Sequence, residues 1–164
     1  MFGRLTRLLN NFSSLDSNII FLKIVSEDNV QKFIIDLNRF DQLFDAGVNS
    51  DGNPLPTYSP YSELVSSDET FTLTSFNGET LSKKKKSGDS WFLLAKGELY
   101  NSFSVRVDDG SFTIENSGTI KLNKKESVDY KFYDILGLTD ESKSEFTQKI
   151  LPMVIREVRT ILLS

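Results

Sequence analysis

The chain has 164 residues, a net charge of −4 and an isoelectric point near 4.9, so its charge balance argues against a protein that coats nucleic acid. It contains neither histidine nor cysteine, which excludes disulfides, thiol chemistry and every Ser-His or Cys-His catalytic arrangement. The length fits a single domain, and no apolar run approaches the length of a membrane span.

Residues 1–17 are predicted to form an N-terminal arm or short helix, ahead of a single domain at residues 18–164. Leu5, Leu8 and Leu9 recur at helical spacing, which is typical of an amphipathic helix. One interpretation is an arm that docks on a neighbouring molecule, which makes these leucines candidate interface residues. The other is a terminus that frays or packs on its own domain. We read no signal peptide here and expect a chain made in the cytosol.

Residues 18–46 are predicted to be mostly helical. Ser26, which two acidic residues follow, is expected to be the N-cap of a helix with apolar side chains at three- and four-residue steps. Gly47 is expected to end this helix. The short apolar run Ile19–Val25 fits either a helix or a strand.

Residues 48–62 are rich in Asn, Asp, Gly and Pro, and they are predicted to form a long loop. The segment around Asn49 is expected to form Asx turns and no calcium loop, because no glutamate follows at the distance that a bidentate ligand requires. Tyr58 and Tyr61 are candidate interface residues, since tyrosine is enriched at binding hot spots, and the alternative is that they pack onto their own domain.

The middle of the chain carries a run of four lysines, Lys83, Lys84, Lys85 and Lys86. One interpretation is a contact with DNA or an acidic partner, and the other, which we favour, is the solvated tip of a loop. Short strands are predicted at Phe71–Leu73 and at Trp91–Leu94, and Ala95–Ser102 is predicted to be a turn that leads into about two helical turns.

The strongest local signal is a β-hairpin at Phe103–Glu115. Apolar and polar residues alternate on both sides of a central Asp-Gly pair, which suits a two-residue type I′ turn. In the register that follows, Val107 lies opposite Phe112 and Val105 opposite Ile114, all on one apolar face. An isolated hairpin is marginal in water, so this face is expected to pack against a C-terminal helix.

Beyond the hairpin, Ile120–Leu122 is a candidate third strand. Thr139 is predicted to cap a helix that runs close to the chain end, with a kink or a break at Pro152. The residues assigned to the core are Leu99, Phe103, Val105, Phe112, Ile114, Phe146 and Ile150. Together these elements predict an α+β fold, with a small antiparallel sheet whose central hairpin packs against a long C-terminal helix, a helical N-terminal region and long loops.

Catalysis without histidine or cysteine would depend on carboxylates, lysine, tyrosine or serine. No carboxylate pair stands out beside apolar neighbours that would raise one pKa, and the serine next to the lysine run lies in a segment expected to be solvated. A small carboxylate-based hydrolase is the enzymatic alternative. We expect no enzymatic activity, no cofactor and no bound metal.

Two motifs flank the hairpin, Lys-Gly-Glu-Leu-Tyr-Asn-Ser-Phe at Lys96–Phe103 and Ile-Leu-Gly-Leu-Thr-Asp-Glu at Ile135–Glu141. The first resembles the Thr-Gly, any residue, Leu, two residues, Ser, apolar signature of tail-completion and head–tail connector proteins of tailed phages, with Lys96 in place of threonine. The second is similar to the Leu-Gly-Leu element that begins their last helix. Asp41–Gly52 and Tyr58–Tyr61 look like versions from phages of gut Bacteroidetes.

The resemblance covers about Asp41–Ser164, and it implies a virion structural protein assembled in the host cytoplasm. Such a protein forms a six- or twelve-fold ring of its own copies in the neck or upper tail, joins portal and head to tail, and contacts neighbouring portal, neck or tail-tube proteins but no membrane. DNA only passes through the channel, and a mildly acidic chain would let it slide. The region before Asp41 fits the family pattern poorly, and Asp129–Asp134 replaces a basic segment.

A second function class is also open from the sequence. A soluble adaptor, or a chaperone for assembly, would bind another protein without belonging to the finished particle. An assembly chaperone would be absent from purified particles, whereas a ring protein would be present in fixed stoichiometry.

Overall fold

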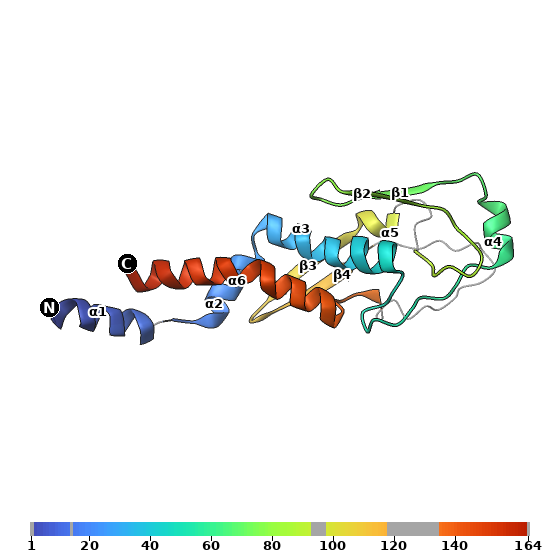
Figure 1. The fold of residues 1–164 in the computed structure, drawn as a ribbon. Coiled ribbons are helices and arrows are strands. Elements are labelled where there is room, and N and C mark those ends of the chain that lie inside the picture. The colour runs from blue at the N-terminus through green and yellow to red at the C-terminus, as the bar shows by residue number, and fades with distance from the viewer. Residues whose placement is uncertain (1, 14, 93–97, 118–134, 164) are drawn as a thin grey trace.

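The computed structural model describes residues 2–13, 15–92, 98–117 and 135–163, and for residues 2–5, 8, 9 and 98 it describes the backbone alone. The elements in chain order are α1 (Phe2–Ser13), α2 (Ser17–Val25), α3 (Asp28–Asp36), η1 (Leu37–Ala46), α4 (Pro60–Val65), β1 (Phe71–Thr74), β2 (Thr80–Lys83), α5 (Glu98–Asn101), β3 (Phe103–Asp108), β4 (Ser111–Asn116) and α6 (Asp140–Leu163). The molecule is elongated, with both termini at one end and α4 at the other (Figure 1).

The strands form two antiparallel pairs, β1 with β2 and β3 with β4. The β3–β4 register is the predicted one, with Val105 opposite Ile114 and Val107 opposite Phe112. The hairpin packs on α6 as expected, since the rings of Phe112 and Phe146 meet edge to face with centroids 5.3 Å apart. The predicted α+β class is therefore confirmed.

The seven residues assigned to the core from the sequence all contribute to it. Four of them are buried, namely Leu99, Phe103, Ile114 and Phe146. The other three, Val105, Phe112 and Ile150, are partly buried and pack against the core. The alternation along the hairpin therefore identified its apolar face correctly.

The helical N-terminal region is confirmed, and Ile19–Val25 lies within a helix, α2. The prediction that Ser26 caps the next helix is wrong. Ser26 ends α2 instead, in a right-handed helical conformation, and donates its backbone N–H to the Leu22 carbonyl (3.0 Å). An N-cap residue needs extended backbone, and Glu27 adopts it at the start of α3.

The helix that follows differs from the regular pattern that its apolar spacing predicted. α3 continues directly into η1, a π-helix, in which each turn is wider than in an α-helix. A period of 3.6 residues places Arg39 and Gln42 opposite the apolar stripe, yet both are buried, whereas Asp41 is exposed. Gly47 ends η1 with φ of +65°, as predicted, and a Cβ atom there would lie 2.7 Å from the Cβ of Ser90.

Strand predictions in the middle of the chain were partly right. β1 is present at Phe71–Thr74, but its partner β2 was not predicted. Trp91 and Phe92 do not belong to a strand, so the prediction of Trp91–Leu94 is wrong for these two residues. They are hydrogen-bonded to the preceding loop instead, from Trp91 N to Pro56 O (2.8 Å) and from Phe92 N to the Tyr58 hydroxyl (3.2 Å).

Other predictions fall partly or wholly outside the described residues, including Leu93, Leu94, Ala95–Gly97 and the candidate strand Ile120–Leu122. α5 covers Glu98–Asn101, within the segment where helical turns were expected, and the residues directly before it lie outside the described ranges. The Asx turn is present, because the Asn49 side chain accepts hydrogen bonds from the backbone N–H groups of Asp51 (3.0 Å) and Asn53 (2.8 Å).

The C-terminal helix α6 begins as predicted, with the Thr139 hydroxyl accepting a hydrogen bond from Ser142 N (3.2 Å). It continues through Pro152, so the predicted alternative of a break into two helices is wrong. Pro152 is exposed. α1 lies beside the C-terminal part of α6, where Asn11 Nδ2 donates to Ile161 O (3.1 Å). No helix in the described ranges is both long and apolar enough to cross a membrane.

Candidate interaction surfaces

A buried group of polar side chains on α3 and η1 was missed by the sequence analysis. This group, the η1 cluster, consists of Asp36, Asn38, Arg39 and Gln42, with exposed fractions between 0% and 7%. The Arg39 guanidinium donates to Asp36 Oδ1 (3.1 Å), Tyr100 O (3.1 Å) and Thr74 O (3.2 Å). Arg39 therefore joins η1 to α5 and to the end of β1.

The two amides of the η1 cluster bind the segment just before α6. Asn38 Nδ2 donates to Ile135 O (2.9 Å) and Gly137 O (2.6 Å). Gln42 donates to the same Gly137 carbonyl (3.0 Å) and accepts from Thr139 N (2.9 Å). The two motifs that flank the hairpin thus supply backbone groups to one buried cluster, so in this fold they position elements around η1.

The aromatic core beside this cluster also holds one of the predicted interface residues. Tyr58 is 9% exposed and its ring meets that of Phe92 with centroids 5.4 Å apart, so it packs on its own domain, which was the stated alternative to an interface role. Tyr100 donates its hydroxyl to Phe92 O. Burial raises the pKa of Tyr100 well above its usual value, which keeps this donor protonated.

The lysine run alternates in direction, as residues of an extended segment do. Lys83 ends β2 and its ammonium lies 3.3 Å from the Asp45 carboxylate, while the Lys85 ammonium lies over the Phe71 ring at 4.4 Å from the centroid. Lys84 and Lys86 are exposed. The favoured prediction of a solvated loop tip therefore fits Lys84 and Lys86 but is wrong for Lys83 and Lys85, which bind groups of their own domain.

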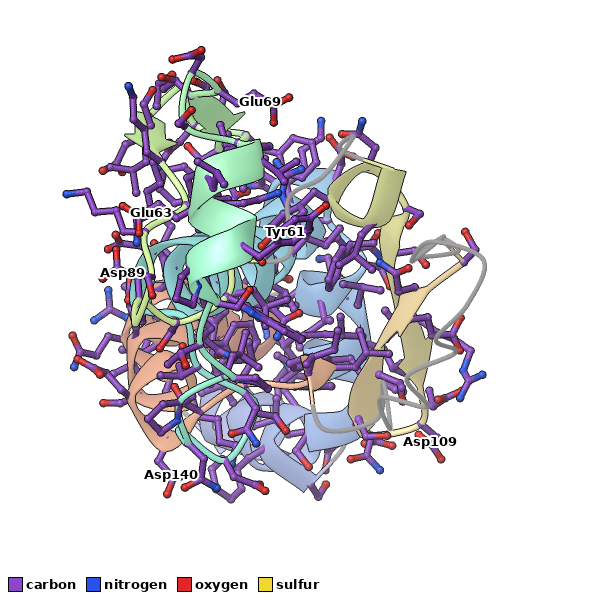
Figure 2. All side chains as sticks on the ribbon, turned by 90° about the vertical axis from the view of Figure 1, so that its right-hand side faces the viewer. Tyr61, Glu63, Glu69, Asp89, Asp109 and Asp140 are labelled. Carbon is purple, nitrogen blue, oxygen red and sulfur yellow. The ribbon has the colours of Figure 1, made fainter. Side chains whose placement is uncertain are left out.

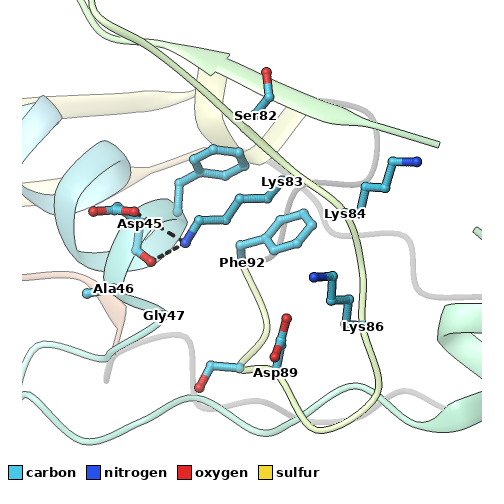
Figure 3. Close-up of a pocket in the computed structure, with 11 residues that line it drawn as sticks. Asp45, Ala46, Gly47, Ser82, Lys83, Lys84, Lys86, Asp89 and Phe92 are labelled. Carbon is cyan, nitrogen blue, oxygen red and sulfur yellow. Dashed lines mark hydrogen bonds and ion pairs between the residues drawn. The ribbon is translucent and has the colours of Figure 1, made fainter. Parts of the chain in front are cut away.

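A pocket of about 420 Å³ opens beside the lysine run (Figure 3). Lys83, Lys84 and Lys86 line it together with Asp45 and Asp89, so the charges of its wall are mixed. Lys83 already points to Asp45. A wall of partnered or solvated lysines with carboxylates between them is a poor site for a specific anion, because each carboxylate repels it.

The helix α4 presents an apolar face to solvent. This α4 face consists of Tyr61, Leu64 and Val65, which are 74%, 73% and 64% exposed. Their spacing puts them on one side of the helix. The Ser59 side chain caps the helix by accepting from Ser62 N (3.2 Å), and no residue of α4 is buried. Figure 2 shows α4 crossing the near end of the molecule, with Tyr61 and Glu63 at its surface.

A second apolar surface lies at the opposite end, between α2 and α6. This α2–α6 groove has a volume of about 370 Å³ and is lined by Leu15, Ser17, Ile20, Phe21, Ile24, Ile150, Val154 and Val158. Phe12 and Ile19, near the same end, are 66% and 63% exposed. An apolar groove with exposed large apolar side chains nearby, such as Phe12 and Ile19, is typical of an interaction site.

The chain segments that carry the two surfaces differ in their charged residues, although the exposed Lys86 also lies beside α4, where Ser87 N donates to the Glu63 carboxylate. Residues 59–70, which contain α4, hold Glu63, Asp68 and Glu69 and no basic residue. Residues 2–26 and 151–163, which flank the groove, hold the basic residues Arg4, Arg7, Lys23, Arg156 and Arg159 and the acidic residues Asp16 and Glu157. Both of these acids already have partners, since Asp16 caps α2 and Glu157 pairs with Lys23.

Of the remaining sequence candidates, Tyr61 is exposed as an interface residue should be. Leu5, Leu8 and Leu9 lie on α1, but their side chains are outside the described residues. In the parts of the chain that the structure describes, no three acidic residues come together as a metal site would require. The interaction surfaces that stand out are therefore the α4 face and the α2–α6 groove.

Comparison of the chain with models of protein families, with curated proteins and with solved structures gave no match. The function is therefore argued from the two surfaces and from the motifs around the hairpin.

Proposed function

We propose that this chain is a non-enzymatic structural protein that assembles into a ring in the neck or upper tail of a tailed phage, where it joins portal and head to tail. The observation that carries the proposal is the pair of exposed apolar surfaces at opposite ends of an elongated molecule. A subunit with two different adhesive ends associates head to tail, and such contacts close into rings when the rotation per subunit allows it.

The phage-like motifs support the location in the particle. The described part of the first motif, Glu98–Phe103, leads into β3, and Ile135–Glu141 leads into α6. This supports the proposal, because the resemblance implies one motif before the hairpin and one before the last helix. Their backbone carbonyls at Tyr100 and Gly137 bind the η1 cluster. Motifs with this role maintain a subunit's shape, which is what a ring component requires.

The function would be tested by light scattering over a concentration series, with electron micrographs of the same samples and protein quantification in purified phage particles. We expect closed rings, six- or twelve-fold by family resemblance, and a fixed number of copies per particle. A chain that is absent from finished particles would contradict the proposal and favour an adaptor or assembly chaperone, because the same apolar surfaces suit a temporary partner.

The proposal also concerns DNA, which would pass through the ring without specific binding. Lys84 and Lys86 are the exposed members of the lysine run, and the net charge of the chain is −4. Tight binding to phosphates needs many basic contacts. A binding assay with duplex DNA at physiological salt should therefore detect no stable complex, and a ring image with a strongly basic inner wall would contradict this part of the proposal.

A further inference from the structure

The two apolar surfaces of this molecule differ in shape. The α4 face is convex, because Tyr61, Leu64 and Val65 project from a short helix. The α2–α6 groove is concave and its wall is almost entirely apolar. A projecting apolar group and an apolar groove can bury each other, whereas two convex surfaces would touch over little area.

The α4 helix buries none of its side chains within the part of the chain that the structure describes. It has six residues and none of them is buried, and helices of this length are unstable alone in water. The contacts that hold it are polar, such as the Ser59 cap and the hydrogen bond from Ser87 N to the Glu63 carboxylate (2.9 Å). Apolar side chains at three positions of such a helix indicate that a partner covers them.

Asp68 and Glu69 are exposed shortly after α4, whereas Glu63 accepts from Ser87 N of its own domain and the exposed Lys86 lies beside it. The charge difference between the two surfaces therefore depends on Asp68 and Glu69. Arg156 and Arg159 are exposed on the part of α6 that reaches the groove end of the molecule. Opposite charges around two surfaces speed their encounter and disfavour contact of either surface with another copy of itself.

We propose that the α4 face of one copy inserts into the α2–α6 groove of a second copy. α4 lies at one end of the molecule, and α2 and α6, which line the groove, lie towards the other, so a chain cannot fill its own groove (Figure 1). The contact is heterologous and leaves one free α4 face and one free groove on every pair, so it propagates until the ring closes. This inference rests on the proposed ring function and names the surfaces that build the ring.

The absence of cysteine from the chain allows a direct test by cross-linking. One variant carries Leu64→Cys on the α4 face and another carries Ser17→Cys in the groove, and both positions are exposed, so folding should be unaffected. The two proteins are mixed and treated with a short bismaleimide at concentrations up to the solubility limit. Thr113→Cys, on the exposed face of β4, replaces Ser17→Cys in the control mixture.

The proposal predicts a cross-linked dimer in the first mixture at a yield several-fold above that of the control mixture, with little product from either variant alone. A dimer of Leu64→Cys with itself would overturn it, because the contact would then be symmetric. A yield equal to that of the control would overturn it as well and would leave the groove to a different protein.

The same samples separate this inference from the proposed function. Rings in the micrographs combined with control-level cross-linking would show that the chain assembles through other surfaces, so the ring function would stand without the pairing. Strong cross-linking between Leu64→Cys and Ser17→Cys in a chain that forms no rings and is absent from particles would support the pairing and contradict the phage function.

Discussion

The η1 cluster and the α4 face place side chains in opposite and equally unusual environments. In the η1 cluster, a charged arginine is 5% exposed and is bound by a carboxylate and two carbonyls. On the α4 face, apolar side chains remain mostly in water. The first arrangement pairs most of its buried polar groups inside the monomer, largely with backbone carbonyls, although Asn38 Oδ1 has no hydrogen-bond partner among the described residues. The second does nothing for the monomer and becomes favourable only in a complex.

The largest expected effect comes from breaking the η1 cluster. Arg39→Met leaves the Asp36 carboxylate buried without its cation, so we expect the free energy of unfolding to fall by about 3–5 kcal/mol, measured by urea denaturation. The matched control is Arg106→Met, since Arg106 pairs with Asp108 and Glu115 at the exposed surface of the hairpin. That control should lose at most about 1 kcal/mol. Equal losses would show that the buried Arg39–Asp36 pair contributes no more to stability than the exposed ion pairs of Arg106.

The α4 face should show the opposite behaviour. Leu64→Asp is expected to leave the free energy of unfolding within about 0.5 kcal/mol of the parent, because Leu64 is 73% exposed. The dissociation constant for self-association should rise about tenfold or more, because a charge would enter an apolar contact. Analytical ultracentrifugation measures the constant. Ser67→Asp adds the same charge nearby without removing an apolar group, and an equal effect there would point to charge alone.

The pH dependence of the free energy of unfolding tests the environment of Asp41, an exposed residue of η1. Partial dehydration of the carboxylate, together with repulsion from Glu145, Asp36, Glu79 and Asp45, raises the pKa of Asp41 from 3.8 to about 6. The folded state then binds this proton more tightly than the unfolded state, so the stabilising effect of protonation is present at low pH and is lost as pH rises through 6.

The variant Asp41→Asn should therefore be more stable than the parent by about 1 kcal/mol at pH 7.5, after allowance for solvent screening at this exposed residue. The difference should shrink towards pH 5, where the parent carboxyl is protonated. Urea denaturation of both proteins across this range measures it. A difference that does not change with pH would show that Asp41 titrates at its ordinary pKa.

The smallest expected effect concerns the lysine run. Lys85→Ala should lower the free energy of unfolding by about 0.5 kcal/mol, because it removes an ammonium that lies over the Phe71 ring. Lys84→Ala, at the next position and exposed, should have no measurable effect. Thermal unfolding of the two variants measures both effects. A larger loss of stability in Lys84→Ala than in Lys85→Ala would contradict the alternating directions of these side chains.

The sequence predicted best where a local pattern determines the structure. The register of β3 and β4 follows from period-2 alternation around an Asp-Gly turn, and all of its pairs were correct. The caps at Gly47 and Thr139 were correct for the same reason, since each depends on one residue and its immediate neighbours. The cap at Ser26 failed because the tight connection between α2 and α3 needed that residue in a helical conformation.

The elements that were missed depend on contacts between distant segments. A regular helical period assigns Arg39 and Gln42 to solvent, and their burial depends on hydrogen bonds to distant segments, including the carbonyls of Thr74, Tyr100 and Gly137. β2 has a single strongly apolar residue, Leu81, and exists because β1 pairs with it. Tyr58 and Tyr61 are three positions apart, Tyr58 in the loop and Tyr61 on α4, and the side of the chain that meets Phe92 decides which of them is buried.

The α4 face could have been predicted from the sequence. Ser59 and Pro60 are a good N-cap and a good first helical residue, and an apolar set at Tyr61, Leu64 and Val65 follows at helical spacing. The density of proline and glycine before this point favoured a loop interpretation. The groove had no such signal, because its two walls come from opposite ends of the chain.

The position of the termini affects how this protein can be labelled. Both lie at the groove end of the molecule, so a tag or fluorescent protein fused to either one would stand beside the surface proposed to receive α4 (Figure 1). The turn between β1 and β2 offers a better place, because a Cβ atom added at Gly78 would meet no atom within 4 Å. A short peptide epitope inserted there would mark every subunit for microscopy and leave both ends of the molecule free.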